Sequence, residues 1–389
     1  MLGMMPRPPL LLLCLPILAA AQTGLSKDGY SQLRDRGVEL VFQGKYAEAE
    51  PVLFHALAAR EREVGPDDPR IIPAIDELAA LYRAEGKNGD AEKLYLRALE
   101  VREKTSGPQS VEIIPDLQVL AGIYESTGKM AEAEKLYLRS NAIRIAAKGT
   151  DDVDLAKDCT ALGLFYMGQK RYAVAEPNLR RAIDILERKL SPEDPALIPV
   201  LDSLASALIE QKNLQAAEAP LRRAVSIQER KDGPRAANVA VRLDRLAMLF
   251  YMEKKYAEAE PLYRRTLAIW ESIMGPESGD LATTLDNLAV VLASQEKYEE
   301  AEPLYRRSLA LRGSATVVSL NNLAMVLDGQ GLDVAAERQY KLAVTLAEKL
   351  ADTQPLVTTL HNYAALLRKL KREYEARRLD SRAKGLTRQ

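Results

Sequence analysis

Apolar residues recur along this chain at a spacing that predicts helices. The segment 281–292 is the clearest example, since its apolar residues fall at i, i+3, i+4 and i+7 and therefore share one helix face. They are Leu285, Leu288, Ala289 and Leu292. After a polar turn at 295–297, a second set predicts another helix over 298–311: Tyr298, Ala301, Leu304, Tyr305, Leu309 and Leu311. The predicted unit is an antiparallel pair of helices joined by a short turn.

This unit repeats along nearly the whole chain. The dipeptide Ala-Glu recurs every 42 residues, at Ala49, Ala91, Ala133, Ala175, Ala217, Ala259 and Ala301, and returns at Ala336 and, as Ala-Arg, at Ala376. A second marker has the same period: Leu78, Leu120, Leu162, Leu204, Leu246 and Leu288, followed by Leu323 and Tyr363. Two markers that share one period indicate a repeat protein. We count nine helix pairs, of which the first, from about Tyr30, is irregular.

Proline and glycine predict where the helices begin and end. Pro73, Pro115 and Pro199 fall near the starts of first helices, where a missing N–H costs nothing. Pro51, Pro177, Pro261 and Pro303 follow the Ala-Glu pair, and we expect them in the first turn of the second helices. Between units lie stop signals such as Gly107-Pro108, Gly233-Pro234 and Gly275-Pro276.

These residues resemble tetratricopeptide repeats (TPRs), and more narrowly the 42-residue type found in kinesin light chains and in many bacterial scaffold proteins. The strongest match runs from Gly275 to Leu311 and includes LATTLDNLA at 281–289 and KYEEAEPLYRRSL at 297–309. The same pattern covers roughly Tyr30 to Ala383. The resemblance implies an all-α fold, a right-handed TPR superhelix (α-solenoid) of about nine antiparallel helix pairs. In this family the first helices line a concave groove that holds peptide segments of partners. The heptad stretch with which a kinesin light chain pairs with its motor chain is not found.

The N-terminal stretch differs from the repeats and predicts export. Residues 1–9 carry one basic residue, Arg7, and no acid, and residues 10–21 are apolar apart from Pro16. Three alanines precede Gln22, which fits cleavage after Ala21. The apolar run is shorter than the roughly 20 residues of a membrane span. We therefore expect a signal peptide at 1–21, a short linker at 22–29 and a TPR solenoid over 30–389 with a basic C-terminal capping segment, in a periplasmic or secreted protein that keeps no stable membrane insertion after cleavage. A retained anchor is the alternative.

The resemblance also identifies candidate residues for partner binding. In the family, an asparagine just before the marker leucine often bonds a partner's backbone, because an amide both donates and accepts. Only the C-terminal repeats keep it, at Asn287, Asn322 and Asn362, and Arg245 holds the equivalent position before Leu246. Two residues after the marker, Met248 and Met325 offer adaptable apolar contact. Arg245, Arg368 and Lys369 would favour an acidic segment. The alternative is that all of these are ordinary solvated helix residues.

Two further features allow either a binding or a structural interpretation. Arginine pairs recur at 42 residues, at Arg180-Arg181, Arg222-Arg223, Arg264-Arg265 and Arg306-Arg307, beside a row of glutamates that includes Glu50 and Glu92. Neutralisation between neighbouring repeats is the favoured interpretation, and a strip for an acidic partner is the alternative. Trp270, the one tryptophan, occupies a position that is mostly polar in other repeats. It is either an exposed contact or packed under the loop at Gly275-Pro276.

Composition and motifs indicate no catalytic, metal or cofactor site. The formal net charge is -1, with 54 basic and 55 acidic residues, so nothing draws the chain to nucleic acid. Two distant histidines and one mature cysteine cannot form a zinc site, and Cys159 aligns with buried leucines. The acidic loop at 151–154 lacks the glycine and glutamate of a calcium loop, and no phosphate-binding glycine loop occurs.

The sequence thus predicts a non-enzymatic scaffold without cofactors that binds a protein or peptide partner in its groove. One alternative is a structural assembly factor of an envelope or secretion complex that acts through the outer face of the solenoid. An enzyme of unrecognised type is the other. Groove binding should depend on Asn287 and Asn322, whereas assembly through the outer face should depend on the arginine pairs or on Trp270.

Overall fold

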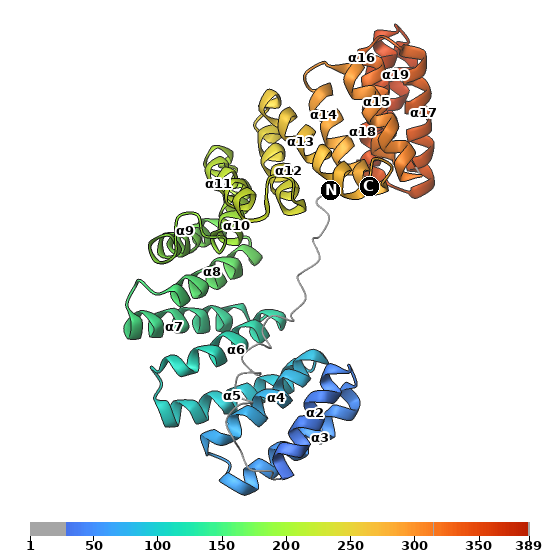
Figure 1. The fold of residues 1–389 in the computed structure, drawn as a ribbon. Coiled ribbons are helices and arrows are strands. Elements are labelled where there is room, and N and C mark those ends of the chain that lie inside the picture. The colour runs from blue at the N-terminus through green and yellow to red at the C-terminus, as the bar shows by residue number, and fades with distance from the viewer. Residues whose placement is uncertain (1–28, 314, 388–389) are drawn as a thin grey trace. The chain divides into compact units, whose positions relative to one another are not determined.

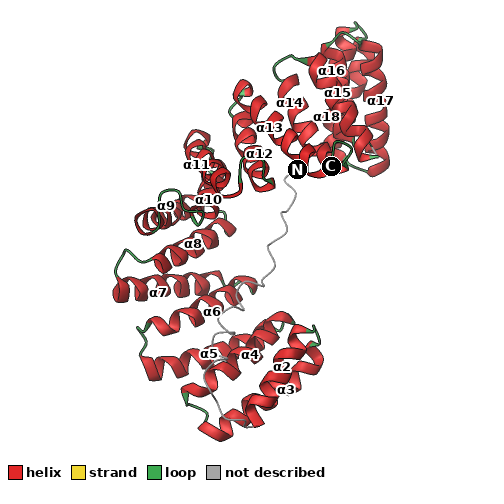
Figure 2. Ribbon diagram, viewed as in Figure 1, coloured by secondary structure: helices red, strands yellow, loops and turns green. Residues whose placement is uncertain are grey.

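The computed structural model describes residues 29–313 and 315–387, and within them every regular element is a helix (Figure 2). The first helices of the successive pairs are α2 (Gly29–Phe42), α4 (Ile72–Ala84), α6 (Ile114–Ser126), α8 (Val153–Gly168), α10 (Leu197–Glu210), α12 (Ala237–Met252), α14 (Ala282–Ala293), α16 (Val317–Gly329) and α18 (Thr353–Lys369). The second helices are α3 (Tyr46–Val64), α5 (Asn88–Ser106), α7 (Met130–Lys148), α9 (Tyr172–Lys189), α11 (Leu214–Asp232), α13 (Tyr256–Met274), α15 (Tyr298–Arg312), α17 (Asp333–Leu350) and α19 (Glu373–Leu386). Short 3₁₀ turns precede α4, α6 and α14, at Pro69–Ile71, Val111–Ile113 and Gly279–Leu281.

The predicted repeat is confirmed in the described residues. The second helices α3 to α15 begin at 42-residue steps from Tyr46 to Tyr298, and α17 and α19 then begin at Asp333 and Glu373. The described helices make up the nine expected pairs, which follow one another along the chain in Figure 1. The expected signal peptide at 1–21 and most of the linker lie outside the described residues.

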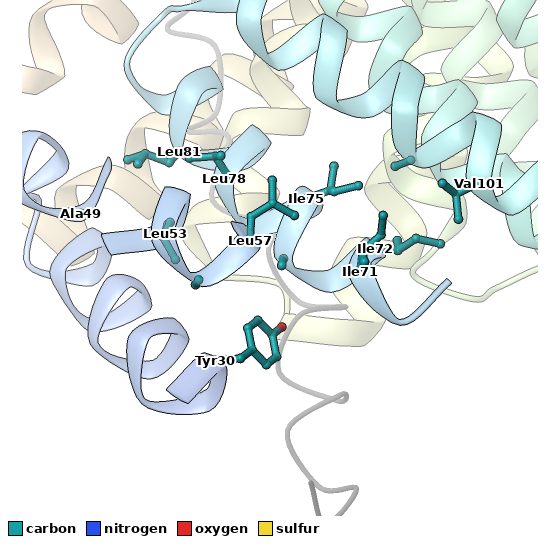
Figure 3. Close-up of a cluster of buried hydrophobic side chains, with 13 residues drawn as sticks. Tyr30, Ala49, Leu53, Leu57, Ile71, Ile72, Ile75, Leu78, Leu81 and Val101 are labelled. Atoms are coloured by element: carbon teal, nitrogen blue, oxygen red, sulfur yellow. The ribbon is translucent and has the colours of Figure 1, made fainter. Parts of the chain in front are cut away.

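The chain divides into two compact units inside α8, since unit 1 ends at Phe165 and unit 2 begins at Tyr166. Figure 3 shows a buried cluster of unit 1, in which side chains of α2, α3, α4 and α5 meet. Its labelled members are Tyr30, Ala49, Leu53, Leu57, Ile71, Ile72, Ile75, Leu78, Leu81 and Val101. A cluster of unit 2 gathers Val317, Leu320, Ala343, Ala347, Leu356, Val357, Leu360 and Ala383. Each pair therefore buries its apolar face against its neighbours, as a repeat unit must.

The repeated alanine marks the place of closest packing in each pair. Its side chain is fully buried in every repeat, at Ala49, Ala91, Ala133, Ala175, Ala217, Ala259, Ala301, Ala336 and Ala376. A larger side chain there would hold the helices apart, since interiors are close-packed. The marker leucines are buried as well, with Leu120 completely enclosed and Leu204 only 4% exposed.

The turn inside each pair requires one residue in the left-handed conformation. Glycine supplies it in four pairs, at Gly44, Gly86, Gly128 and Gly331. Residues with a side chain adopt it in the others, at Lys170, Lys212, Lys254, Glu296 and Lys371, with φ between 60° and 64°. The turn geometry is thus the same in repeats whose sequences differ, and five repeats hold a strained residue there.

Proline follows the prediction in the first helices but not in the second. Pro73 and Pro115 lie at the first or second helical position of α4 and α6, where the missing N–H is harmless. Pro51 and Pro261 are instead the sixth residues of α3 and α13, beyond the first turn, so that prediction was wrong. The reason is that the second helices already begin at the tyrosine five residues earlier, directly after the left-handed turn. Each of these prolines removes one backbone hydrogen bond from its helix.

In three of the four arginine pairs the second arginine joins successive second helices. Arg265 lies 2.5 Å from Glu229 and donates to the carbonyl of Pro234 at 2.8 Å, and Arg307 makes the same contacts with Glu271 and Pro276. Arg97, Arg139 and Arg223 repeat the arrangement. The first arginines bind the glutamate four residues earlier on the same helix, as Arg306 does with Glu302 at 2.8 Å. Neutralisation between neighbouring repeats, the favoured interpretation, is confirmed for Arg223, Arg265 and Arg307, whereas the first arginines are neutralised within their own helix.

Candidate functional site

The candidate site lies in unit 2 on the surface formed by its first helices α12, α14, α16 and α18, which we call the first-helix face. The residue before the marker leucine and the one two after it both belong to this face. At the first position Arg245, Asn287, Asn322 and Asn362 are all partly buried. At the second position Met248 and Met325 are exposed by 42% and 48%. All seven candidates therefore lie on the first helices of unit 2, and six of them hold these two positions.

The methionines belong to a larger apolar surface than the sequence indicated. Val241 and Val318, seven residues before Met248 and Met325, are exposed by 46% and 53%. Met252, one turn after Met248, is exposed by 40%. Residues at i, i+7 and i+11 lie along one line of a helix, so α12 and α16 each present an apolar stripe. The signal was available in the sequence, because Val241 and Val318 hold corresponding positions in their repeats.

Two of the asparagines join a small polar cluster. Asn362 donates through Nδ2 to Oδ1 of Asn321 at 3.0 Å, and Asn321 donates to Oδ1 of Asn322 at 3.2 Å. The amides of Asn321 and Asn362 also approach the sulfur of Met325, at 3.6 and 3.4 Å. Asn321 is buried and was not among the predicted residues. It holds the two neighbouring amides in place, so they retain donors and acceptors for a peptide backbone.

The candidate cations are already paired within the chain. Arg245 lies 3.0 Å from Asp202 of α10 and donates to the hydroxyl of Ser206 at 2.7 Å. Lys369, the seventh candidate, lies 2.7 Å from both Asp328 and Asp333. Arg368 pairs with Asp380 of α19. Arg245 and Lys369 therefore connect repeats, and Arg368 connects the two helices of the last pair. This leaves less positive charge for an acidic partner than the sequence suggested.

Asparagine 287 contacts a carboxylate instead of a neighbouring amide. Its Nδ2 lies 3.4 Å from Oδ1 of Asp244, which is the residue before Arg245 on α12. Burial raises the pKa of the Asp244 carboxyl above its ordinary value, and the bond from Asn287 opposes that rise only in part. This carboxylate was not among the predicted site residues.

Trp270 is partly buried in α13. The corresponding residue is Leu186 or Gln228 in the two preceding repeats. In two other repeats it is an arginine that reaches a carboxylate on the first helix of the same pair. Arg102 lies 2.9 Å from Asp76, and Arg312 lies 2.7 Å from Asp286. The equivalent carboxylate in the repeat of Trp270 is Asp244, so an indole stands where those two repeats place a guanidinium.

In unit 1, the position just before the marker leucine carries no asparagine. Glu77, only 6% exposed, lies 2.6 Å from Arg34 of α2. Burial raises the pKa of Glu77 to about 7, although the charge of Arg34 opposes the rise. Asp116 is buried and paired with Arg102, and burial raises its pKa to about 6. These buried carboxylates therefore connect helices of unit 1 through ion pairs.

The remaining chemistry-bearing residues do not gather. Cys159 is fully buried, and the two histidines, His55 and His361, are exposed on different units. Among residues 29–313 and 315–387, no group of three or more metal-ligating side chains is found. Over the same residues, no helix combines the length and the apolar character that crossing a bilayer requires.

Comparison with known proteins agrees with the repeat geometry. Sequence profiles of the tetratricopeptide repeat match residues 37–104, 71–146, 156–230, 236–314 and 316–353, which together are more than half of the chain. The chain belongs to the tetratricopeptide-repeat family. TPR folds are in general non-catalytic scaffolds for protein interaction, and membership supports that broad function here. Nothing in the family match shows catalysis.

Two solved structures with TM-scores above 0.5 show the same fold as this TPR chain at low sequence identity. The apo form of RapI is 14% identical, with a TM-score of 0.60, and the match covers 93% of this chain and 99% of RapI. The C-terminal part of a TPR protein from Cytophaga hutchinsonii is 16% identical with a TM-score of 0.52, covering 74% and 98%. Repeats of a putative kinesin light chain from Podospora anserina are 21% identical with a TM-score of 0.47, covering 53% and 99%. No curated protein matches the sequence.

Proposed function

We propose that this TPR protein is an exported, non-enzymatic scaffold that binds a peptide segment of a protein partner on the first-helix face of unit 2. The observation that carries the proposal is the combination of exposed apolar side chains with half-buried amides on consecutive first helices. Met248 and Met325 supply adaptable apolar contact, and Asn287, Asn322 and Asn362 supply paired donors and acceptors. On such a surface, burial of apolar area contributes most of the affinity for a peptide, and hydrogen bonds to the amides fix the orientation of the peptide main chain.

The proposed export rests on residues 1–21. Their single basic residue, short apolar run and terminal alanines are the order of features in a secretory signal. Expression of the full chain in a bacterial host tests this part. We expect a periplasmic product that begins at Gln22, as read by N-terminal sequencing, and a cytoplasmic product when 1–21 is deleted. A full-length chain that stays in the cytoplasm would refute export.

Peptide binding can be tested with a library of random 12-residue peptides displayed on phage. Clones selected on the wild-type chain would be synthesised and titrated by fluorescence anisotropy. We expect the double variant Asn287→Ala, Asn322→Ala to weaken binding at least tenfold, since two backbone bonds are lost. Asn178→Ala is the matched control, because that partly buried amide lies on α9 and, among the described residues, bonds only the carbonyl of Val174. Equal binding by the double variant and the control would exclude the first-helix face.

One observation supports the second candidate, assembly through the second helices. Phe54, Leu96 and Leu138 hold the same position on α3, α5 and α7 and are exposed by 56%, 42% and 48%. The equivalent residues of unit 2 are the arginines at 180, 222, 264 and 306. A row of large apolar side chains in three consecutive repeats is typical of a contact surface. Neither the arginine pairs nor Trp270 forms this row.

The chain itself supplies a suitable variant for that candidate. Phe54→Arg, Leu96→Arg and Leu138→Arg introduce the residue that later repeats carry at this position, so folding should be retained. If the second candidate holds, the triple variant loses its partner or its self-association in cross-linking and gel filtration. Unchanged assembly in a chain whose circular dichroism spectrum is also unchanged would exclude this surface.

A further inference from the structure

Most of the aspartates that lie two residues before a marker leucine pair with an arginine, and one does not. Four repeats carry aspartate at the second position before the marker leucine: Asp76, Asp202, Asp244 and Asp286. Asp76 and Asp286 are paired with arginines of the same repeat, and Asp202 lies 3.0 Å from Arg245 and 3.4 Å from Arg242 of the next repeat. Asp244 bonds only the amide of Asn287 among the described residues.

The exception has a clear structural origin. An arginine reaches these aspartates from three places, which lie 26, 40 and 43 residues further along the chain, as Arg102, Arg242 and Arg245 do. For Asp244 the same three places are occupied by Trp270, Thr284 and Asn287, all of them neutral. The neighbouring Arg242 and Arg245 are held by Asp202 on the other side of α12.

A partly buried carboxylate without a cation is an unfavourable arrangement. Desolvation penalises the charged form, and one long bond from an amide compensates little of that cost. Tyr263 is buried near Asp244, but a phenol carries no positive charge that could stabilise the carboxylate. The three equivalent aspartates show what the position accommodates, because each of them accepts a guanidinium. A guanidinium from another molecule would restore the missing partner.

Trp270 adds a second reason for a cation. Tryptophan is the aromatic side chain to which cations bind best, and here it occupies the position from which Arg102 and Arg312 reach Asp76 and Asp286 in their repeats. Trp270 and Asp244 are both partly exposed, so neither is closed off by the core. Asn287, which bonds Asp244, is itself a residue of the first-helix face.

We propose that an arginine side chain of the bound peptide pairs with Asp244, between α12 and α14, at the place where Trp270 stands instead of the arginine that pairs with Asp76 or Asp286 in their own repeats. This inference rests on the proposed peptide binding by the first-helix face. It reverses the charge preference expected from the sequence, because Arg245 and Lys369 are paired internally whereas Asp244 is not. The partner segment is therefore basic at this point rather than acidic.

The test uses peptides selected from the random library on the full chain. We expect arginine to be enriched at one position of the selected peptides. Replacing that arginine by citrulline, which has the same shape but no charge, should weaken binding to the wild-type chain about tenfold. The same replacement should change binding to Asp244→Asn less than twofold. The control Asp286→Asn removes a carboxylate that already has Arg312 and should keep the tenfold preference.

A second variant guards against a folding defect in Asp244→Asn. Trp270→Arg introduces the arginine that the repeats of Asp76 and Asp286 carry at this position, so we expect a well-folded chain that no longer distinguishes arginine from citrulline. Selected peptides without arginine enrichment, or a citrulline effect that persists in both variants, would overturn the inference. Peptides that need Asn287 and Asn322 yet ignore the citrulline change would overturn it while leaving the proposed function intact. A library that yields no binder dependent on those asparagines would instead refute the proposed function.

Discussion

The left-handed residue in the turn between α12 and α13 offers a quantitative test of how the repeats are built. Lys254 has φ of 60°, and the equivalent residue is glycine in four other repeats. A side chain in this conformation costs about 1 kcal/mol or more, whereas glycine adopts it freely. Glycine loses more backbone entropy on folding, which offsets part of the gain. We therefore expect Lys254→Gly to stabilise this turn by about 0.5–1 kcal/mol.

The measurement should report on the turn itself, because a repeat array need not unfold in one step. The amide of Lys255 donates to the carbonyl of Phe250 at 2.8 Å and closes the turn. Hydrogen exchange of that amide should slow about two- to fivefold in Lys254→Gly if the turn opens locally. The urea midpoint, followed by circular dichroism, should rise as well. Combining the change with Lys170→Gly and Lys212→Gly should add to the effect, since the three turns lie in different repeats.

The control is Lys254→Ala, which removes the charge and the flexible chain but keeps Cβ and hence the strain. We expect it to change the exchange rate little. If alanine stabilises the turn as much as glycine does, the gain comes from the lysine side chain and not from the backbone. If glycine speeds exchange, the entropy cost exceeds the strain and the argument fails.

Three further predictions follow from buried or closely packed residues. Since burial raises the pKa of Glu77 from 4.5 unfolded to about 7 folded, unit 1 should lose up to about 3 kcal/mol of stability as the pH rises from 4.5 to 7. Urea midpoints at several pH values should show this fall in the wild-type chain and a flatter profile in Glu77→Gln. Gly329→Ala would place a methyl group 2.5 Å from the ring of Tyr298, so we expect a loss of about 1–2 kcal/mol in thermal unfolding, with recovery in a chain that also carries Tyr298→Ala. Arg307→Ala removes the contacts with Glu271 and with the carbonyl of Pro276, and it should lower the free energy of unfolding by about 1 kcal/mol. An unchanged urea midpoint would show that solvent screens this ion pair completely.

The sequence by itself determined the repeat architecture. Helix pairs, their 42-residue period and their buried markers follow from local periodicity, because a helix places i, i+3 and i+7 on one face whatever surrounds it. Ala259 and Leu246 could therefore be assigned to the core from spacing alone, and both are buried. The positions of the candidate amides on the first helices follow from the same register.

The tertiary structure decided which of the polar residues are already engaged. Arg245 looked available for a partner, but Asp202, 43 residues earlier, holds it. The sequence did not single out Asp244. Its lack of a cationic partner depends on three neutral residues of two other helices, Trp270 of α13 and Thr284 and Asn287 of α14. Such pairings depend on distances between side chains of different repeats, and helical periodicity carries no information about those distances. The helix pattern states which face a charge occupies, whereas only packing between repeats determines whether that charge has a partner.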